Sequence, residues 1–266
     1  MYKRQAYSPY TYVANNPINA IDPDGRLIVY VNGLLFKQAL GAKLNPFRRY
    51  RPNSFGTQIQ TGQSPTFNNK EINYWGRPDD VGSTRNSING IFNDNHNVFA
   101  NGSHHFRSQA SERFELGQKA GNELIAQLQN GTIELENEET IKVVGHSQGA
   151  AHAAGILTQL LDSEYADRVE AGIYLSPHQP GGFETPQADN VFGAQFSTGS
   201  DIVSSRGGVL GQLINLFNGS SELDRIEGTD FLLIRADYKG KKGGHDVDSW
   251  NQVLQDINTF LNDDED

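Results

Sequence analysis

Short apolar runs rich in Val, Ile, Leu and Phe recur along the chain and alternate with segments whose apolar residues follow helical spacing. The apolar runs predict buried strands, and the segments between and after them predict helices. Strands that alternate with helices in this way indicate an α/β fold, a mostly parallel sheet with helices on both faces. The predicted strands are 27–31, 140–145, 169–175, 191–197 and 231–236, and the predicted helices are 111–129, 149–161, 209–217 and 249–261.

The pattern is weaker between residues 44 and 106. Residues 44–62 are polar and basic, and they predict a surface loop. A short strand is predicted at 71–75, whereas 76–106 lacks a clear period and predicts a long irregular region. The acidic residues 263–266 predict a solvated tail.

One junction between a strand and a helix carries a motif with chemical meaning. Residues 145–149, GHSQG, join the strand that begins at Thr140 to a helix rich in Ala and Leu. In a nucleophile elbow, a strained turn between strand and helix lifts a serine hydroxyl clear of the sheet edge. Gly145 and Gly149 are small enough for the two elements to approach closely. The same spacing also occurs in ordinary turns, but this context predicts Ser147 as a nucleophile.

Backbone amides on two segments are candidates for an oxyanion hole. The Gln148 amide lies at the start of the predicted helix, where the helix dipole favours negative charge. The second donor is expected from the loop after strand 27–31, at the amides of Gly33 and Leu34. A simple turn at the end of this strand is the alternative interpretation of that loop.

A serine hydroxyl needs a base to take its proton and an acid to orient that base. In α/β-hydrolases, whose nucleophile elbow this motif resembles, the three residues follow the chain order serine, acid, histidine. His245 follows the last predicted strand on a glycine-rich loop just before the final helix, and it is the predicted base. The predicted acid is Asp201, directly after strand 191–197, and Asp237 is its rival.

Composition narrows the possible functions. The 266 residues suffice for one main domain, and the lack of cysteine excludes disulfides, a thiol nucleophile and a cysteine-ligated zinc site. A net charge of -10 and a pI near 5.1 argue against nucleic-acid binding and against electrostatic docking on an anionic membrane. No cofactor or metal site is predicted, since residues 94–97 lack the bidentate acid of a calcium loop.

Residues 1–26 differ from the rest of the chain, because they are rich in Tyr, Asn, Pro and turn-forming residues. The motifs YTY at 10–12, NNP at 15–17 and DPDG at 22–25 resemble, in that order, the end of the core in Rhs and YD-repeat proteins. In that family the signature closes a shell of β-repeats. A variable C-terminal domain, usually a toxin, follows it.

The Rhs resemblance implies that 1–26 is the end of a repeat core, that 27–266 is its cargo domain, and that the whole is part of a much longer protein. It also implies self-cleavage that depends on Asp22, although Arg26 stands where the family has leucine. The implied partners are the Rhs shell and a cognate immunity protein. Delivery by a specialised secretion system is expected, because residues 1–12 have no apolar core like that of a Sec signal peptide.

The order of elements around the elbow is that of an α/β-hydrolase. GHSQG at 145–149 and GSDIV at 199–203 resemble the corresponding segments of lipases and lipase-like esterases, particularly those of class 3. The resemblance implies a lipase or phospholipase that cleaves acyl esters of membrane lipids with a Ser-Asp-His triad. An Asn-Gly pair at 32–33 stands where lipases usually have His-Gly.

Two other functions stay open on the sequence alone. A non-toxic esterase or thioesterase with small acyl substrates would use the same residues, and a hydrolase fold that has lost activity would serve as a binding module. Residues 207–219 are unusually apolar, with glycines at each end. They are interpreted either as a helix packed on the sheet or as a lid that contacts a membrane surface.

Overall fold

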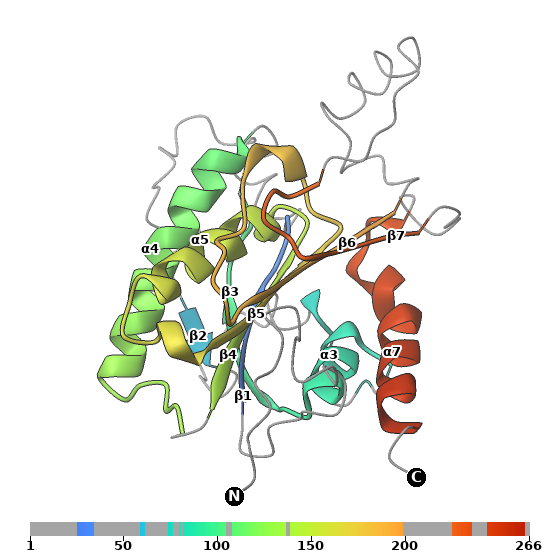
Figure 1. The fold of residues 1–266 in the computed structure, drawn as a ribbon, viewed down its shortest axis with the longest axis horizontal. Coiled ribbons are helices and arrows are strands. Elements are labelled where there is room, and N and C mark those ends of the chain that lie inside the picture. The colour runs from blue at the N-terminus through green and yellow to red at the C-terminus, as the bar shows by residue number, and fades with distance from the viewer. Residues whose placement is uncertain are drawn as a thin grey trace, which may run out of the picture.

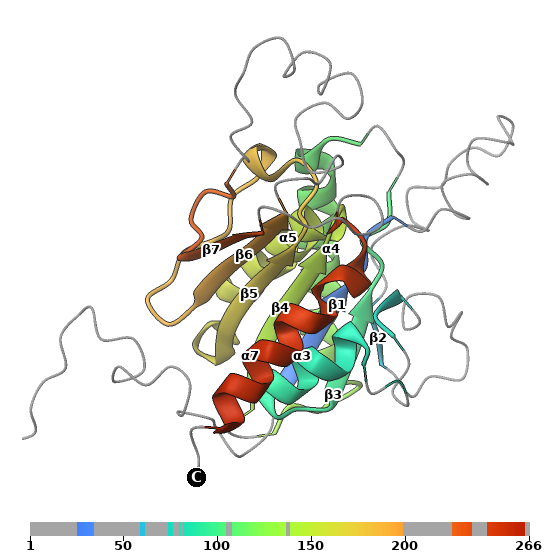
Figure 2. The ribbon, with the colours of Figure 1, turned by 90° about the vertical axis from the view of Figure 1, so that its right-hand side faces the viewer.

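The computed structural model describes residues 26–34, 59–61, 74–76, 80, 82–104, 108–136, 139–198, 225–235 and 244–263. The described strands form one sheet in the order β2-β3-β1-β4-β5-β6-β7, in which only β2 runs antiparallel to its neighbour (Figure 2). The strands are β1 (Arg26–Val31), β2 (Ile59–Thr61), β3 (His96–Ala100), β4 (Thr140–His146), β5 (Val169–Leu175), β6 (Phe192–Thr198) and β7 (Phe231–Arg235).

Helices cover both faces of the sheet (Figure 1). One face carries α4 (Ala110–Gln129) and α5 (Gly149–Leu161), and the other carries α3 (Thr84–Phe92) and α7 (Asn251–Asp263). This two-sided cover confirms the predicted α/β class. Short 3₁₀ helices complete the described part of the fold: η3 (Ala166–Arg168), η4 (Pro180–Gly182) and η6 (Val247–Trp250).

Strand β1 shows how the sequence fits a sheet that is buried on both faces. Leu27, Val29 and Val31 belong to the core under α4 and α5, whereas Ile28 and Tyr30 belong to the core under α3 and α7. All five side chains are fully buried. Because successive side chains of a strand point to opposite faces, a continuous apolar run is what a doubly covered parallel strand requires.

Helices α4 and α5 approach each other closely because glycines face the partner backbone. A Cβ atom on Gly117 of α4 would lie 2.0 Å from the carbonyl oxygen of His152. A Cβ atom on Gly155 of α5 would lie 2.1 Å from the carbonyl oxygen of Phe114. The helix that follows GHSQG is therefore held against α4 at backbone contact.

The region between residues 71 and 106 differs from the prediction. Of the strand predicted at 71–75, the structure describes only Tyr74 and Trp75. The prediction is wrong for these two residues, because Tyr74 is helical and Trp75 lies in a bend. The region predicted as irregular contains both α3 and β3. Helix α3 begins after a Ser83 cap, whose hydroxyl accepts from the Asn86 amide, and it packs against α7.

Several predicted features lie outside the described residues. They include the Rhs-like motifs with Asp22, and residues 201–224 with Asp201 and the apolar stretch 207–219. The domain boundary after residue 26 therefore stays a prediction. Within the described part of the chain, no helix is both long enough and apolar enough to span a bilayer.

Candidate active site

Ser147 stands at the turn between the central strand β4 and helix α5, with a positive φ of 56°. A residue with a Cβ atom rarely adopts this conformation, which stores about 1–3 kcal/mol of strain. Neighbouring backbone holds the turn in place: the Ser147 amide donates to the Leu175 carbonyl (3.0 Å), and the His178 amide donates to the Ser147 carbonyl (3.0 Å). Strand β5 and the loop after it thus support the elbow.

The backbone around Ser147 is closely packed. A Cβ atom on Gly149 would lie 2.4 Å from the Val31 carbonyl oxygen, and one on Gly33 would lie 2.7 Å from the Ser147 Cβ atom. On the preceding strand, a Cβ atom on Gly145 would lie 2.7 Å from that of Ala153. Larger residues at these positions would displace the backbone, so both glycines of the motif serve the close approach of strand and helix.

Ser147 and His245 lie together in the fold although 98 positions separate them. The distance from Ser147 Oγ to His245 Nε2 is 2.7 Å, which is a normal hydrogen-bond distance. Only 4% of Ser147 and 6% of His245 are exposed. The imidazole is therefore placed to accept the proton of the hydroxyl.

Side chains from two elements hold the backbone next to His245. The Gly244 carbonyl accepts from Ser249 Oγ (2.7 Å) and from Ser176 Oγ (3.3 Å). Ser176 follows β5 at a positive φ of 41°, and its hydroxyl also accepts from Trp250 Nε1 (3.0 Å). The segment that carries His245 is thus joined to the end of β5.

The predicted oxyanion donors differ in their surroundings. Gln148 is the N-cap residue of α5, and its side-chain oxygen accepts from the His104 amide (3.0 Å). In the loop after β1, a Cβ atom on Gly33 would lie 2.5 Å from the Tyr74 hydroxyl oxygen, and the amides of Gly33 and Leu34 both stay candidates. Burial raises the pKa of Tyr74 far above its ordinary value, whereas the nearby Gly33 backbone acts in the opposite direction. The hydroxyl therefore keeps its proton.

The predicted acid is not part of the described structure. Strand β6 ends at Thr198, shortly before Asp201 in the chain, and at the same carboxyl edge of the sheet as Ser147. The rival Asp237 also lies outside the described residues. The assignment of Asp201 therefore stays a prediction.

Two residues beside the Ser147–His245 pair were missed by the sequence reasoning. The Tyr74 hydroxyl bonds His146 Nδ1, and His146 Nε2 lies 2.7 Å from the carbonyl oxygen of His245. The motif places His146 next to the serine, but no sequence pattern shows that its ring faces the segment of the base. Tyr74 precedes His146 by 72 positions and carries no motif.

Other polar groups near the elbow are buried. Burial lowers the pKa of His152 to about 3, and the nearby His104 and Arg113 act in the same direction. His152 is therefore neutral at ordinary pH. Among the described residues, no group of three or more His, Cys, Asp or Glu side chains is arranged to hold a metal ion.

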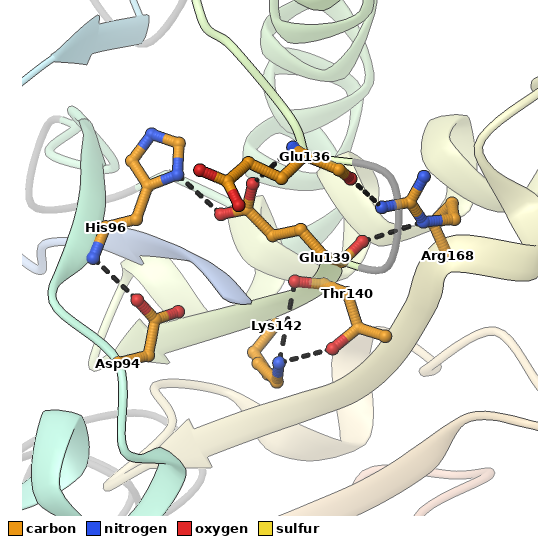
Figure 3. Close-up of polar contacts among 7 residues, drawn as sticks. All are labelled: Asp94, His96, Glu136, Glu139, Thr140, Lys142 and Arg168. Atoms are coloured by element: carbon orange, nitrogen blue, oxygen red, sulfur yellow. Dashed lines mark hydrogen bonds and ion pairs between the residues drawn. The ribbon is translucent and has the colours of Figure 1, made fainter. Parts of the chain in front are cut away.

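A second polar cluster lies at the opposite edge of the sheet, where β3 and β4 begin (Figure 3). His96 Nδ1 pairs with Glu139 Oε1 (2.5 Å), and the fully buried Lys142 pairs with Glu170 (2.9 Å). The Asp94 carboxylate accepts from the His96 amide (2.6 Å). Ser147 follows the other end of β4, so this cluster bears on stability and not on the chemistry of the elbow.

Comparison with known proteins gives distant structural likenesses. The chain matches no protein-family profile and no curated protein sequence. The solved structures to which it is similar include a metagenomic carboxyl esterase (12% identity, TM-score 0.41, 92% of this chain and 77% of that chain). They also include a cutinase-like protein from Cryptococcus sp. (11% identity, TM-score 0.37, 91% of this chain and 96% of that chain). A fungal esterase from Rhizomucor miehei is similar too (10% identity, TM-score 0.39, 92% of this chain and 76% of that chain). Likenesses this distant do not establish an activity.

Proposed function

We propose that this chain is a serine ester hydrolase. The observation that carries the proposal is the distance of 2.7 Å between Ser147 Oγ and His245 Nε2 at a strained turn after the central strand. A serine hydroxyl becomes a useful nucleophile when a base lies within hydrogen-bonding distance. The turn also keeps its oxygen at the carboxyl edge of the sheet, where a substrate carbonyl can approach.

In the proposed first step, Ser147 Oγ bonds to the ester carbonyl carbon while His245 Nε2 takes the hydroxyl proton. The carbonyl oxygen becomes an oxyanion, for which the amides of Gln148 and of Gly33 or Leu34 are the proposed donors. When this intermediate collapses, the alcohol leaves with the proton from His245, and an acyl-enzyme remains. Water then attacks in the same way, releases the carboxylic acid and restores Ser147. Asp201 is proposed to orient the imidazole and stabilise its positive charge.

Acyl esters of membrane lipids are the proposed substrates. This choice of substrate is supported by the resemblance of residues 145–149 and 199–203 to class 3 lipases. The resemblance of residues 1–26 to the end of an Rhs core supports a role as a delivered effector with a cognate immunity protein. In this role, residues 207–219 are proposed to contact the membrane surface during catalysis.

Release of fatty acid from phospholipid vesicles by the purified chain tests the proposal, with a short-chain nitrophenyl ester as second substrate. We expect hydrolysis of both, and a fall in kcat of about a thousandfold or more in Ser147→Ala. Ser111→Ala, at an exposed position of α4, is the matched control and should keep full activity.

The outcomes separate the alternatives. Hydrolysis of the short ester alone would favour an esterase or thioesterase with small acyl substrates. If neither ester is cleaved and a fluorophosphonate probe does not label Ser147, the hydrolase proposal is wrong, and a binding module is the better interpretation.

A further inference from the structure

The ring of His146 bridges a tyrosine and the backbone of the base. Its Nδ1 atom bonds the Tyr74 hydroxyl, and its Nε2 atom lies 2.7 Å from the carbonyl oxygen of His245. A carbonyl oxygen can only accept a hydrogen bond, so Nε2 carries the proton. In the neutral ring Nδ1 is then the acceptor, and Tyr74 is the donor.

Tyr74 lies next to the loop after β1, where a Cβ atom on Gly33 would be 2.5 Å from its hydroxyl oxygen. Its proton is given to His146. The chain of hydrogen bonds therefore runs in one direction, from Tyr74 through His146 to the carbonyl oxygen of His245. A neutral His146 in a single tautomer satisfies every group in it.

Packing leaves the ring of His146 little freedom. The residue is only 2% exposed. Its ring centroid lies 5.6 Å from that of Tyr74, 6.3 Å from that of Trp75 and 5.4 Å from that of His245. A rotated ring would lose both hydrogen bonds and leave buried polar groups unpaired, which is unfavourable.

We propose that His146 is a positioning residue for the base His245, and that Tyr74 holds the ring of His146 in place by donating to Nδ1. The inference rests on the proposed roles of Ser147 and His245. His146 and Ser147 are adjacent and contact His245 at two points, its carbonyl oxygen and its ring Nε2. Two contacts fix both the backbone position and the direction of the ring. Such control matters because a misplacement of about 1 Å lowers a rate by up to about 100-fold.

Substitutions at His146 separate the effects of its two hydrogen bonds, to Tyr74 and to the His245 carbonyl. In His146→Gln, the side-chain amide nitrogen reaches about the position of Nε2 and can still donate to the His245 carbonyl. In His146→Asn, the shorter side chain keeps an acceptor for Tyr74 but does not reach that carbonyl. Tyr74→Phe removes the hydroxyl alone. His152→Asn is the matched control, because His152 is a buried histidine of α5 whose ring is influenced by His104 and Arg113.

We expect kcat on a nitrophenyl ester to fall roughly 10- to 100-fold in His146→Asn, with KM within about twofold, and to fall less than about fivefold in His146→Gln. The rate at which a fluorophosphonate labels Ser147 should follow kcat. The acidic limb of the pH profile should move in His146→Asn but not in His146→Gln, because the base keeps its place only in the latter. In His152→Asn, kcat should stay within about twofold whatever the change in Tm.

Nitrogen NMR of His146 tests the hydrogen-bond chain without relying on activity. The wild-type ring should be neutral and protonated on Nε2, and Tyr74→Phe should keep that proton on Nε2 but shift the Nδ1 resonance, because Nδ1 loses its hydrogen-bond donor. A wild-type ring protonated on Nδ1, or equal losses of kcat in the Asn and Gln variants, would overturn the positioning role. A wild-type chain that neither labels nor hydrolyses would overturn the proposed function instead, and the NMR result would still decide the chain of hydrogen bonds.

Discussion

At the scale of single residues, two serines with strained backbone conformations lie beside the proposed base. Ser147 and Ser176 have positive φ values of 56° and 41° at the ends of the adjacent strands β4 and β5. The Ser147 hydroxyl contacts the ring of His245, and the Ser176 hydroxyl contacts the Gly244 carbonyl. Strain of this kind persists where surrounding contacts over-determine the backbone, and such positions cluster at active sites.

The strain at Ser147 predicts a measurable conflict between stability and activity. Ser147→Gly and Ser147→Ala both remove the hydroxyl and its bond to His245, but only glycine adopts a positive φ without penalty. The free energy of unfolding should therefore be about 1 kcal/mol higher in Ser147→Gly than in Ser147→Ala. Urea unfolding of the two inactive variants measures the difference. An equal or lower value for the glycine variant would show that the turn is not strained.

At the scale of elements, the contact between α4 and α5 sets where the elbow helix lies. Gly155→Ala would place a Cβ atom 2.1 Å from the Phe114 carbonyl oxygen, and the two helices would have to separate. We expect a loss of about 1–3 kcal/mol in the free energy of unfolding, which outweighs the gain of up to about 1 kcal/mol in helix propensity. Gly82→Ala is the control, because its nearest neighbour would be 3.8 Å away. Equal Tm values for the two variants would contradict the close contact.

The elements also show how far the sequence predicts the structure. Strands β1 and β5 carry apolar runs, which Glu170 interrupts in β5, and their predicted bounds agree with the structure to within one residue. Strand β3 and helix α3 were missed, because polar residues beside their apolar positions hide the periodic pattern. Tertiary packing stabilises both elements. The motif and the chain order pointed to Ser147 and His245, whereas Tyr74 could not be found, since only the fold brings it to His146.

At the scale of the whole molecule, the carboxyl and amino ends of the strands form two edges of the sheet that carry different kinds of residues. The carboxyl edge gathers Ser147 and His245 from distant parts of the chain. The amino edge carries the buried charges of Figure 3, with Lys142 fully buried and Asp94 only 5% exposed. Because these charges are remote from the elbow, they can change the stability of the fold without a direct effect on the chemistry of Ser147.

This separation predicts how stability depends on pH. Burial raises the pKa of Asp94 from 3.8 to about 6, and the hydrogen bond to Glu139 raises the pKa of His96. Both groups hold a proton more tightly in the folded state than in the unfolded state. Their contribution to stability is therefore greatest at low pH and is lost as the pH rises through the folded pKa values. The folded protein should be less stable near neutral pH than in mild acid.

Asp94→Asn tests this dependence, because asparagine is nearly isosteric, cannot ionise and keeps an acceptor for the His96 amide. Between about pH 5 and about pH 7.5, the free energy of unfolding of the wild type should fall by about 1 kcal/mol more than that of the variant. Urea unfolding at the two pH values measures it. Asp80→Asn, at an exposed position, should keep the wild-type difference. If Asp94→Asn keeps it too, the Asp94 carboxyl is ionised in the folded protein across this range, and His96 with Glu139 must account for any remaining dependence.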